Sequence, residues 1–379
     1  MTTEMRFFLA SLLLDFSEQG EFALPSKTLS SQYGVSLNTV NKTLKYLVMS
    51  GYANRMDVSL KRGRPIGRYV FTEALNAKLN EPSDWIDSIR PVEFWEQLAI
   101  KFIGRGGHGK YTISNRYLIC LLAMFANEVG VVEAIPSSRV AKILGFTSLR
   151  LRSQLNSLIA HQVLISHTGG VTGKHLFGKV PGIYFLNIES VAEILNIPLE
   201  ELSFRKMNRG VISEGQDRYQ IMRLYRLARL LLEIEFDSDG KSLAVEEAYQ
   251  KKWWAYEQDS FKKVCLFFRD HDQTRVPDYL QTKLEQYIAS YLSIASLSEQ
   301  SKKRKEADYL KPKIATDCLP AKFRQDETIR ETFSLFVDEI FSIVEGVANK
   351  YSDYFELKEL LDVRFRISAY EEGFTIEAF

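Results

Sequence analysis

The sequence predicts a mainly α-helical protein with small β wings, arranged as two tandem units of one kind followed by a helical domain. Three observations support this fold class. A segment near the start of the chain recurs 111 residues later, basic side chains gather in both copies, and apolar residues recur at helical spacing towards the end. The expected boundaries are 1–78 and 113–189 for the two units, 79–112 for a connector and 190–379 for the helical domain.

The repeat is clearest between residues 24–51, LPSKTLSSQYGVSLNTVNKTLKYLVMSG, and residues 135–162, IPSSRVAKILGFTSLRLRSQLNSLIAHQ. At an offset of 111, identical residues coincide in pairs: Pro25 with Pro136, Ser26 with Ser137, Gly34 with Gly145, Leu44 with Leu155, and Leu47 with Leu158. The apolar stretch at 7–16 has a counterpart at 117–125. Each copy predicts a helix, a second helix, a tight turn, a third helix and a basic hairpin. This order is typical of a winged helix-turn-helix.

Local signals place the ends of the helices in the first copy. We expect Ser26 to cap the second helix, because its hydroxyl can accept a hydrogen bond from an otherwise unpaired amide. Gly34 permits the positive φ of the tight turn. Ser36 is expected to cap the third helix, at the end that can face a phosphate, and Gly51 to end it. Three apolar residues at i, i+4 and i+7 should face the core: Val40, Leu44 and Leu47.

The outer face of the third helix, its flanks and the basic hairpin supply the candidate DNA contacts of the first copy. These candidates are Ser26, Lys27, Ser36, Leu37, Asn38, Thr39, Asn41, Lys42, Lys45, Lys61, Arg62, Gly63, Arg64 and Arg68.

One set of residues in this copy carries a family resemblance: Leu24-Pro25-Ser26, Leu29, Gly34-Val35-Ser36, Thr39-Val40, Leu44, Leu47 and Gly51. The set resembles the GntR-type winged helix-turn-helix DNA-binding domain, over about 65 of the 379 residues. That family commonly has arginines where this chain has Leu37 and Asn41. Because arginine suits guanine and asparagine suits adenine, we expect the first copy to prefer an A·T-containing half-site. The second half of the chain does not resemble the ligand-binding domains usual in that family, so no small-molecule effector is inferred.

The hairpin of the first copy contains residues 61–73, KRGRPIGRYVFTE. Its Gly-Arg-Pro run ahead of an aromatic residue resembles the wing of several regulator families, including PadR-type proteins. Residues 61–65 also resemble the core of an AT-hook. Both resemblances imply that arginines enter a narrow A·T minor groove, where the negative potential is enhanced. The alternative is a plain hairpin whose basic residues only soften phosphate repulsion.

The second copy is more divergent. Thr147 stands where Ser36 stands and should cap the third helix. Leucines at 151, 155 and 158 should face inwards. The following hairpin, 169–182, also contains His175. Candidate DNA contacts are Ser137, Thr147, Ser148, Arg150, Arg152, Ser153, Asn156, Lys174 and Lys179. The alternative is a degenerate winged helix that serves dimerisation.

Charge separates the two halves of the chain. Residues 1–182 hold 21 Lys and Arg against 13 Asp and Glu, a balance of +8, while residues 183–379 hold 28 against 35, a balance of −7. Residues 27–70 contain eight basic side chains and one acidic one, and residues 137–180 contain six and none. A polyanion such as double-stranded DNA would meet this charge on the two repeats.

Several classes of protein are disfavoured. The three cysteines, Cys120, Cys265 and Cys318, show no CxxC spacing, so neither a disulfide framework nor a metal site is expected, and a reducing cytoplasm fits. The N-terminal apolar run recurs inside the chain and is not a signal sequence, and no stretch is long enough to cross a membrane. Residues 104–110 match part of a nucleotide-binding loop, but Tyr111 replaces the required Ser or Thr, which favours a linker. No catalytic pair is recognisable, so no enzyme and no cofactor are expected.

The last domain should be helical and acidic. Apolar residues recur at helical spacing in 218–236, 278–297 and 326–350. Pro312 and Pro320 are expected to bracket a loop, and the basic run 301–305 to be a solvated loop. We expect this domain to pair two chains into a homodimer or, alternatively, to bind a partner.

Together these patterns predict a cytoplasmic, nucleoid-associated transcriptional regulator that binds double-stranded DNA sequence-specifically with tandem winged helices. One alternative is a plasmid or mobile-element replication initiator or maintenance protein that binds DNA repeats. A third is an enzyme subunit that binds ATP through residues 104–110. A short palindrome beside a promoter would favour the regulator, and an array of direct repeats the initiator.

Overall fold

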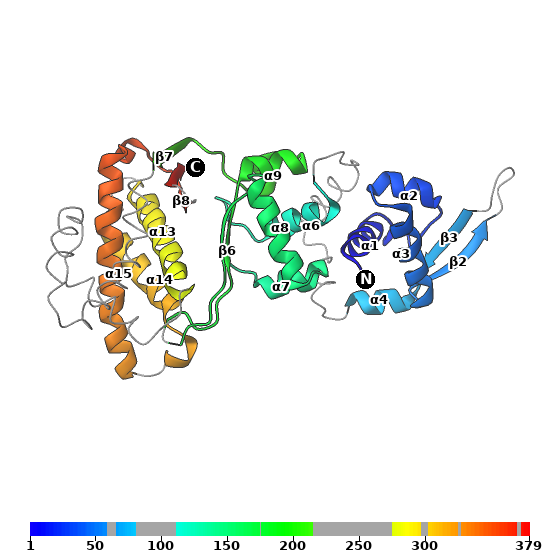
Figure 1. Cartoon of the computed structure of the whole chain (residues 1–379), viewed down its shortest axis with the longest axis horizontal. Coiled ribbons are helices and arrows are strands. Elements are labelled where there is room, and N and C mark those ends of the chain that lie inside the picture. The colour runs from blue at the N-terminus through cyan, green and yellow to red at the C-terminus, as the bar shows by residue number, and fades with distance from the viewer. Residues whose placement is uncertain are drawn as a thin grey trace, which may run out of the picture. The chain divides into compact units, whose positions relative to one another are not determined.

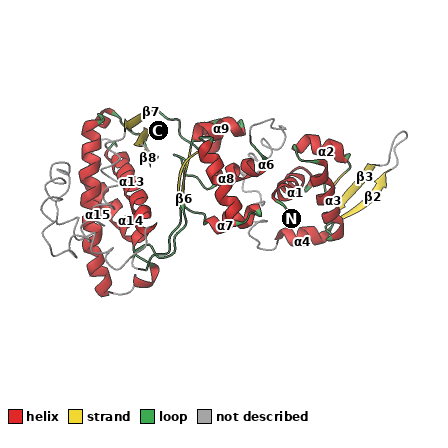
Figure 2. Ribbon diagram, in the orientation of Figure 1, coloured by secondary structure: helices red, strands yellow, loops and turns green. Residues whose placement is uncertain are grey.

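The computed structural model describes residues 1–58, 66–80, 111–174, 176–214, 275–296, 302–324, 327–369 and 373–379 (Figure 1). In these ranges the chain is mainly helical with small antiparallel sheets, as predicted (Figure 2). It divides into two compact units. The first unit comprises Met1–Leu164 and Leu186–Phe204, and the second comprises Ile165–Phe185 and Arg205–Phe379. None of the described helices is both long and apolar enough to span a membrane.

The same order of elements occurs twice. The first copy consists of α1 (Thr3–Phe16), β1 (Glu21–Phe22), α2 (Ser26–Tyr33), α3 (Leu37–Met49), β2 (Ala53–Val58), β3 (Ile66–Phe71) and α4 (Glu73–Asn80). The second consists of α6 (Ile113–Met124), β4 (Val131–Val132), α7 (Ser137–Leu144), α8 (Ser148–Ala160), β5 (Leu164–Thr168), β6 (Ile183–Leu186) and α9 (Ile188–Leu195). Helices α7 and α8 each begin 111 residues after α2 and α3, so the sequence offset is kept.

Short-range contacts define the first copy. Gly34 ends α2 in the left-handed conformation at φ 63°, and the Ser36 hydroxyl accepts a hydrogen bond from the Thr39 amide at 3.1 Å, which caps α3. The prediction that Ser26 caps α2 is wrong. Pro25 occupies the cap position without a side-chain hydrogen bond, and Ser26 is already the first helical residue. A proline there presets the backbone for the turn into the helix.

The core of the first copy lies between α1, α3 and the sheet, whose strand order is β1-β3-β2. Phe8 packs edge-on against Tyr33 with 5.4 Å between ring centroids, and Phe22 stacks on Tyr69 at 5.1 Å. The predicted inward residues of α3 are buried: Val40, Leu44 and Leu47. In the hairpin, β2 and β3 pair antiparallel from Ala53 opposite Phe71 to Val58 opposite Ile66.

The second copy uses the same local devices. Gly145 ends α7 at φ 68°, and the Thr147 hydroxyl accepts from the Arg150 amide at 3.2 Å to cap α8, as predicted. The predicted inward leucines are buried: Leu151, Leu155 and Leu158. Its sheet has the order β4-β6-β5. Strands β5 and β6 each contain a boundary between the units along the chain, at 164/165 and at 185/186.

The first unit ends with a short helix, η1 (Leu199–Leu202). The second unit contains a helical layer and a small sheet. Its elements after residue 204 are β7 (Arg209–Glu214), α13 (Arg275–Ala295), α14 (Lys302–Cys318), η3 (Ala321–Phe323), α15 (Glu327–Tyr354), η4 (Leu357–Glu359), β8 (Phe365–Ala369) and β9 (Gly373–Ala378). The three long helices pack on one another, and α13 also packs against β8 (Figure 1). The sheet has the order β7-β9-β8 and is antiparallel throughout.

The sequence predicted two of these helices, at 278–297 and 326–350, where α13 and α15 lie. The third predicted helix, 218–236, falls outside the described residues. The expected loop between the two prolines is wrong, because Pro312 lies inside α14. That helix is held in place by Leu310, Ile314 and Cys318, which are fully buried.

Candidate nucleic-acid interface

Helix α3 exposes the residues that the sequence placed on its outer face. Five of these side chains are exposed: Leu37, Asn38, Asn41, Lys42 and Lys45. Thr39 is half-buried, and its hydroxyl lies 2.9 Å from that of Ser36. No acidic residue occurs between Glu21 and Asp57. The outer face of α3 therefore combines amide and ammonium groups without a carboxylate on the same helix.

The preceding helix contributes less. Ser26 is half-buried at the start of α2, and Lys27 beside it is exposed. Because α2 and α3 pack together around the turn at Gly34, Lys27 lies on a neighbouring element of the same copy. It adds positive charge without an amide or apolar group that could distinguish bases.

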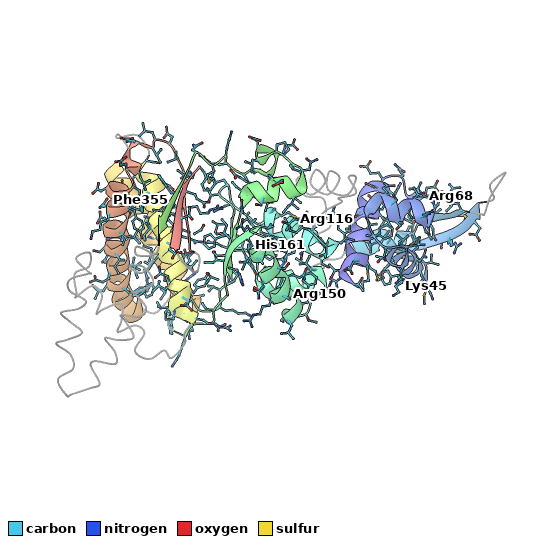
Figure 3. All side chains as sticks on the ribbon, turned by 45° about the horizontal axis from the view of Figure 1, so that its top comes forward. Lys45, Arg68, Arg116, Arg150, His161 and Phe355 are labelled. Atoms are coloured by element: carbon cyan, nitrogen blue, oxygen red, sulfur yellow. The ribbon has the colours of Figure 1, made fainter. Side chains whose placement is uncertain are left out.

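At the base of the first hairpin, basic residues are already paired. The Arg68 guanidinium donates to the Glu21 carboxylate through Nε at 2.9 Å and Nη2 at 2.6 Å, across strands β1 and β3. Arg55 and Asp57 form a second pair at 3.1 Å on β2. Arg68 and Lys45 both belong to the first copy (Figure 3). The candidate wing residues Lys61, Arg62, Gly63 and Arg64 lie outside the described residues.

Helix α8 exposes a comparable but less basic face. Four predicted outer residues are exposed: Ser148, Arg152, Ser153 and Asn156. Leu149 has 80% of its surface exposed, although the sequence did not single it out. Ser137 lies half-buried at the start of α7, where Pro136 takes the cap position as Pro25 does in the first copy.

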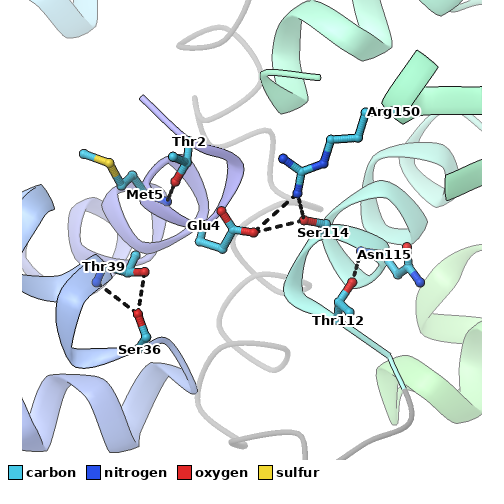
Figure 4. A network of polar contacts seen from close by, with 9 residues as sticks. All are labelled: Thr2, Glu4, Met5, Ser36, Thr39, Thr112, Ser114, Asn115 and Arg150. Carbon is cyan, nitrogen blue, oxygen red and sulfur yellow. Dashed lines mark hydrogen bonds and ion pairs between the residues drawn. The ribbon is translucent and has the colours of Figure 1, made fainter. Parts of the chain in front are cut away.

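Arg150 differs from its neighbours because its side chain turns towards the first copy. Its Nη2 lies 2.9 Å from the Ser114 hydroxyl and 3.5 Å from the Glu4 carboxylate (Figure 4). The guanidinium also sits 4.8 Å from the centre of the Phe146 ring. The sequence makes Arg150 a candidate base or phosphate contact, and the structure gives it an intramolecular role.

Glu4 is the acidic partner in this cluster. Partial burial disfavours its charge, but hydrogen bonds from its own amide and from Thr2, together with Arg150 and Ser114, outweigh that effect. The pKa of the Glu4 carboxyl is therefore lowered, and it remains charged in the pairing with Arg150 at neutral pH. The Ser114 hydroxyl lies 3.3 Å from the Glu4 carboxylate as well. No sequence pattern pointed to Glu4, because its partners in the second copy are more than 100 positions away.

A second link between the copies starts from Arg6. Its Nη1 donates to the carbonyl oxygens of Lys142 at 2.6 Å and Ile143 at 2.9 Å. These carbonyls belong to the last turn of α7, where a helix leaves acceptors without intrahelical partners. Phe7 and Tyr117, both buried, pack edge-on with their ring centroids 6.1 Å apart. Helix α1 therefore contacts the second copy at α6 and at the end of α7, in addition to its pairing with Arg150 on α8.

The second hairpin is anchored within the second unit. The Phe177 amide donates to the Cys318 carbonyl oxygen at 2.6 Å, and its ring packs edge-on against Tyr279 at 4.9 Å. Thr168 and Thr282 bring their hydroxyls to 2.9 Å of each other. The candidate residues Lys174 and Lys179 are exposed on the same hairpin, and His175 lies outside the described residues. Sequence reasoning did not foresee that α13 and α14 hold this hairpin.

The thiols of the described residues are buried. Burial raises the pKa of Cys120 and of Cys318 to about 12, so both are protonated at neutral pH and poorly suited to nucleophilic attack. Within the described ranges, no three His, Cys, Asp or Glu side chains are grouped as a metal site would require. Cys265 and residues 104–110 lie outside those ranges.

No family model matches the chain, and no curated protein matches its sequence.

Proposed function

We propose that this protein is a transcriptional regulator that binds double-stranded DNA sequence-specifically, with two tandem winged helix-turn-helix domains. The first domain resembles the GntR type. The observation that carries the proposal is the exposed outer face of α3, which begins at the Ser36 cap and presents Asn41, Lys42 and Lys45. The element order around this helix occurs twice in the chain, which supports two such domains.

The physical chemistry of α3 suits a major groove, which admits one α-helix. Asn41 can pair with both hydrogen-bonding groups of adenine, and exposed leucines can contact thymine methyl groups. Leu37 and Leu149 occupy the first turns of α3 and α8 and are 47% and 80% exposed. Lys42 and Lys45 supply charge for phosphates, and the capped N-terminus of α3 favours an anion.

The proposal includes the setting in which such a regulator acts. The protein would act in the cytoplasm on nucleoid DNA, without catalysis and without a cofactor, and would repress by occupying its site. The acidic second unit would pair two chains into a homodimer. The charge balance supports DNA binding by the first half of the chain and dimerisation by the second. It is +8 over residues 1–182 and −7 over residues 183–379.

Selection from a pool of random duplexes tests the proposal. The full chain should enrich a defined motif that contains A·T pairs, and enrichment should weaken steeply as salt rises, because each neutralised phosphate releases counterions. A Lys42→Ala/Lys45→Ala variant should bind the same motif more weakly. Failure of the full chain to enrich any motif at low salt would refute sequence-specific binding of duplex DNA.

A replication initiator or maintenance protein is the second candidate. One observation favours it: the outer faces of α3 and α8 differ, with Asn41 aligned to Arg152 at the offset of 111. Two recognition helices with different outer faces in one chain suit an asymmetric or directly repeated DNA site better than a palindrome. Footprints on the DNA that adjoins the gene would separate the candidates. A row of evenly spaced direct repeats would favour initiation, and one protected site over a promoter would favour regulation.

A further inference from the structure

Four consecutive residues of α1, Glu4 to Phe7, include three side chains that reach the second copy. Glu4 contacts α6 and α8 through Ser114 and Arg150, Arg6 contacts the end of α7, and Phe7 contacts Tyr117 on α6. One short segment of the first copy therefore contacts three helices of the second copy, α6, α7 and α8. A single contact would permit rotation about itself, whereas contacts to three separate helices restrict it.

The Arg6 contact is the best-defined of the three. Its guanidinium donates to two carbonyls at the C-terminal end of α7, where a positive charge also interacts favourably with the helix dipole. Gly145 follows directly and lacks a side chain. A Cβ there would lie 2.9 Å from Arg6 Nε, too close for real contacts. Gly145 thus serves the turn through its positive φ and also leaves space for Arg6.

The Arg150 contact connects this arrangement to the DNA-facing helix. Arg150 projects from the first turns of α8, between the exposed residues Leu149 and Arg152. Its side chain is 42% exposed, so the charge pair with Glu4 alone would contribute little stability. The contact matters for DNA binding because Arg150 lies on the candidate DNA-facing helix, so its pairing with Glu4 restrains α8 directly.

We propose that Glu4, Arg6 and Arg150 are positioning residues that hold the two copies in one arrangement, so that one chain engages two half-sites at a single spacing. This inference rests on the proposed function for its DNA consequence, but the fixed arrangement itself does not. Half-sites that lie on one face of DNA are separated by whole turns of about 10–10.5 base pairs. An insertion of about half a turn moves the second half-site to the opposite face, where a fixed α8 does not reach it.

Two spin labels on the full chain test the arrangement without DNA. Glu18→Cys in the first copy and Glu189→Cys in the second place the labels on exposed sites outside the candidate interface. Cys265→Ser removes the native cysteine that lies outside the described residues, and the other two are buried. With the labelled chain diluted in excess unlabelled protein, so that a dimer holds at most one labelled chain, double electron–electron resonance should give one narrow distance distribution for this protein and a broad one for the Arg6→Gln/Arg150→Gln variant. A broad distribution in the parent, or an equally narrow one in the variant, would overturn the proposal.

A charge exchange separates positioning from folding. In Glu4→Arg/Arg150→Glu the ion pair is rebuilt with its ends reversed, and the Ser114 hydroxyl can donate or accept. This variant should recover the narrow distribution that Arg150→Glu alone loses. Arg152→Ala is the matched control on the same helix, and it should leave the distribution unchanged. If the Arg6 variant unfolds in a thermal melt, the comparison of Arg150→Glu with the exchange still decides the outcome, because Arg150 is partly exposed.

DNA spacing gives the second readout. Simultaneous engagement of two sites typically raises affinity by about 10²–10⁴-fold. The parent should lose about 10²-fold or more when half a helical turn is inserted between the selected half-sites, and Arg6→Gln/Arg150→Gln should lose much less. Equal losses in both would overturn the role of these residues in spacing. A narrow distance distribution in a protein that binds no DNA would refute the proposed function and leave the fixed arrangement standing.

Discussion

Arg68 holds both oxygens of Glu21 with its Nη2, each at 2.6 Å, and the two side chains are 44% and 38% exposed at the base of the first hairpin. If the protein binds DNA as proposed, this carboxylate would compete with a DNA phosphate for the Arg68 guanidinium. Such an exposed pair contributes little to stability. Under the proposed function, the pair would therefore affect DNA binding at the wing more than it affects the fold.

Removing that competitor should strengthen DNA binding. Glu21→Gln leaves Arg68 without its charged partner, so affinity should rise and the log–log salt slope should steepen by about 0.9, the value for one added phosphate contact. Arg68→Ala is the control: the double variant Glu21→Gln/Arg68→Ala should not show the increase in DNA affinity. Filter binding across a salt series measures both. Weaker binding by Glu21→Gln would show that the ion pair shapes the hairpin.

Neighbouring residues on α3 should separate base recognition from phosphate attraction. Asn41→Ala should cost about 1–3 kcal/mol on the best site and relax selection at one base pair, because the amide pairs with a base edge. Lys42→Ala should weaken binding to all sequences alike and reduce the salt slope. Competition with single-base variants of the selected site measures both. An unchanged sequence profile for Asn41→Ala would place base recognition elsewhere on the helix.

The two hairpins should contribute unequally to binding. Arg62→Ala/Arg64→Ala should cost more on a site flanked by an A-tract than on one flanked by G·C, because the narrow minor groove has the deeper negative potential. The matched change Lys174→Ala/Lys179→Ala should cost less, since Phe177 and Thr168 hold that hairpin against α13 and α14. Equal losses on both flanks would reduce Arg62 and Arg64 to general phosphate contacts.

The anchored hairpin should matter for stability. Phe177 is 5% exposed and packs on Tyr279, so Phe177→Ala should lower the free energy of unfolding by about 3–5 kcal/mol. Lys179→Ala, an exposed change on the same hairpin, should have little effect. Urea denaturation followed by circular dichroism gives both values. A loss below about 1 kcal/mol for Phe177→Ala would mean that the hairpin is not part of the cooperative unit.

His167 should make stability depend on pH. Burial lowers the pKa of His167 to about 4, while an unfolded histidine titrates near 6.5. Between these values the unfolded chain binds a proton that the folded chain excludes, so the free energy of unfolding falls as the pH drops from about 6.5 to 4. His167→Phe keeps a ring on Tyr184, 4.5 Å away, and should flatten that slope.

Sequence and structure agree at four caps and turns that neighbouring residues decide. The caps at Ser36 and Thr147 and the turns at Gly34 and Gly145 each depend on contacts within a few positions. The prediction for Ser26 misses by a single position, because Pro25 can itself begin the turn into the helix.

Other features depend on contacts that no local pattern contains. Pro312 lies within α14 although proline removes one helical hydrogen bond, because buried neighbours on that helix outweigh the loss. The sequence places Arg150 correctly on an outer face, but its partner Glu4 lies 146 positions earlier. Strands β7 and β9 pair across more than 150 residues, so neither segment carries a local sign of their shared sheet.

Residues 165–185, between β5 and β6, lie in the sequence between the two segments of the first unit but belong to the second unit. A ribosome that has released residues 1–164 has not yet made the helices on which residues 165–185 rest. The α13 and α14 residues that contact residues 165–185 are made later, and the first unit is incomplete until residues 186–204 have been made. The two copies are therefore not equivalent, because the first lies wholly within the first unit and the second is divided between the two units. A fragment that ends or begins at residue 190 would therefore lack part of each unit. Each unit consists of two separate segments of the chain, so truncation from one end does not isolate either unit.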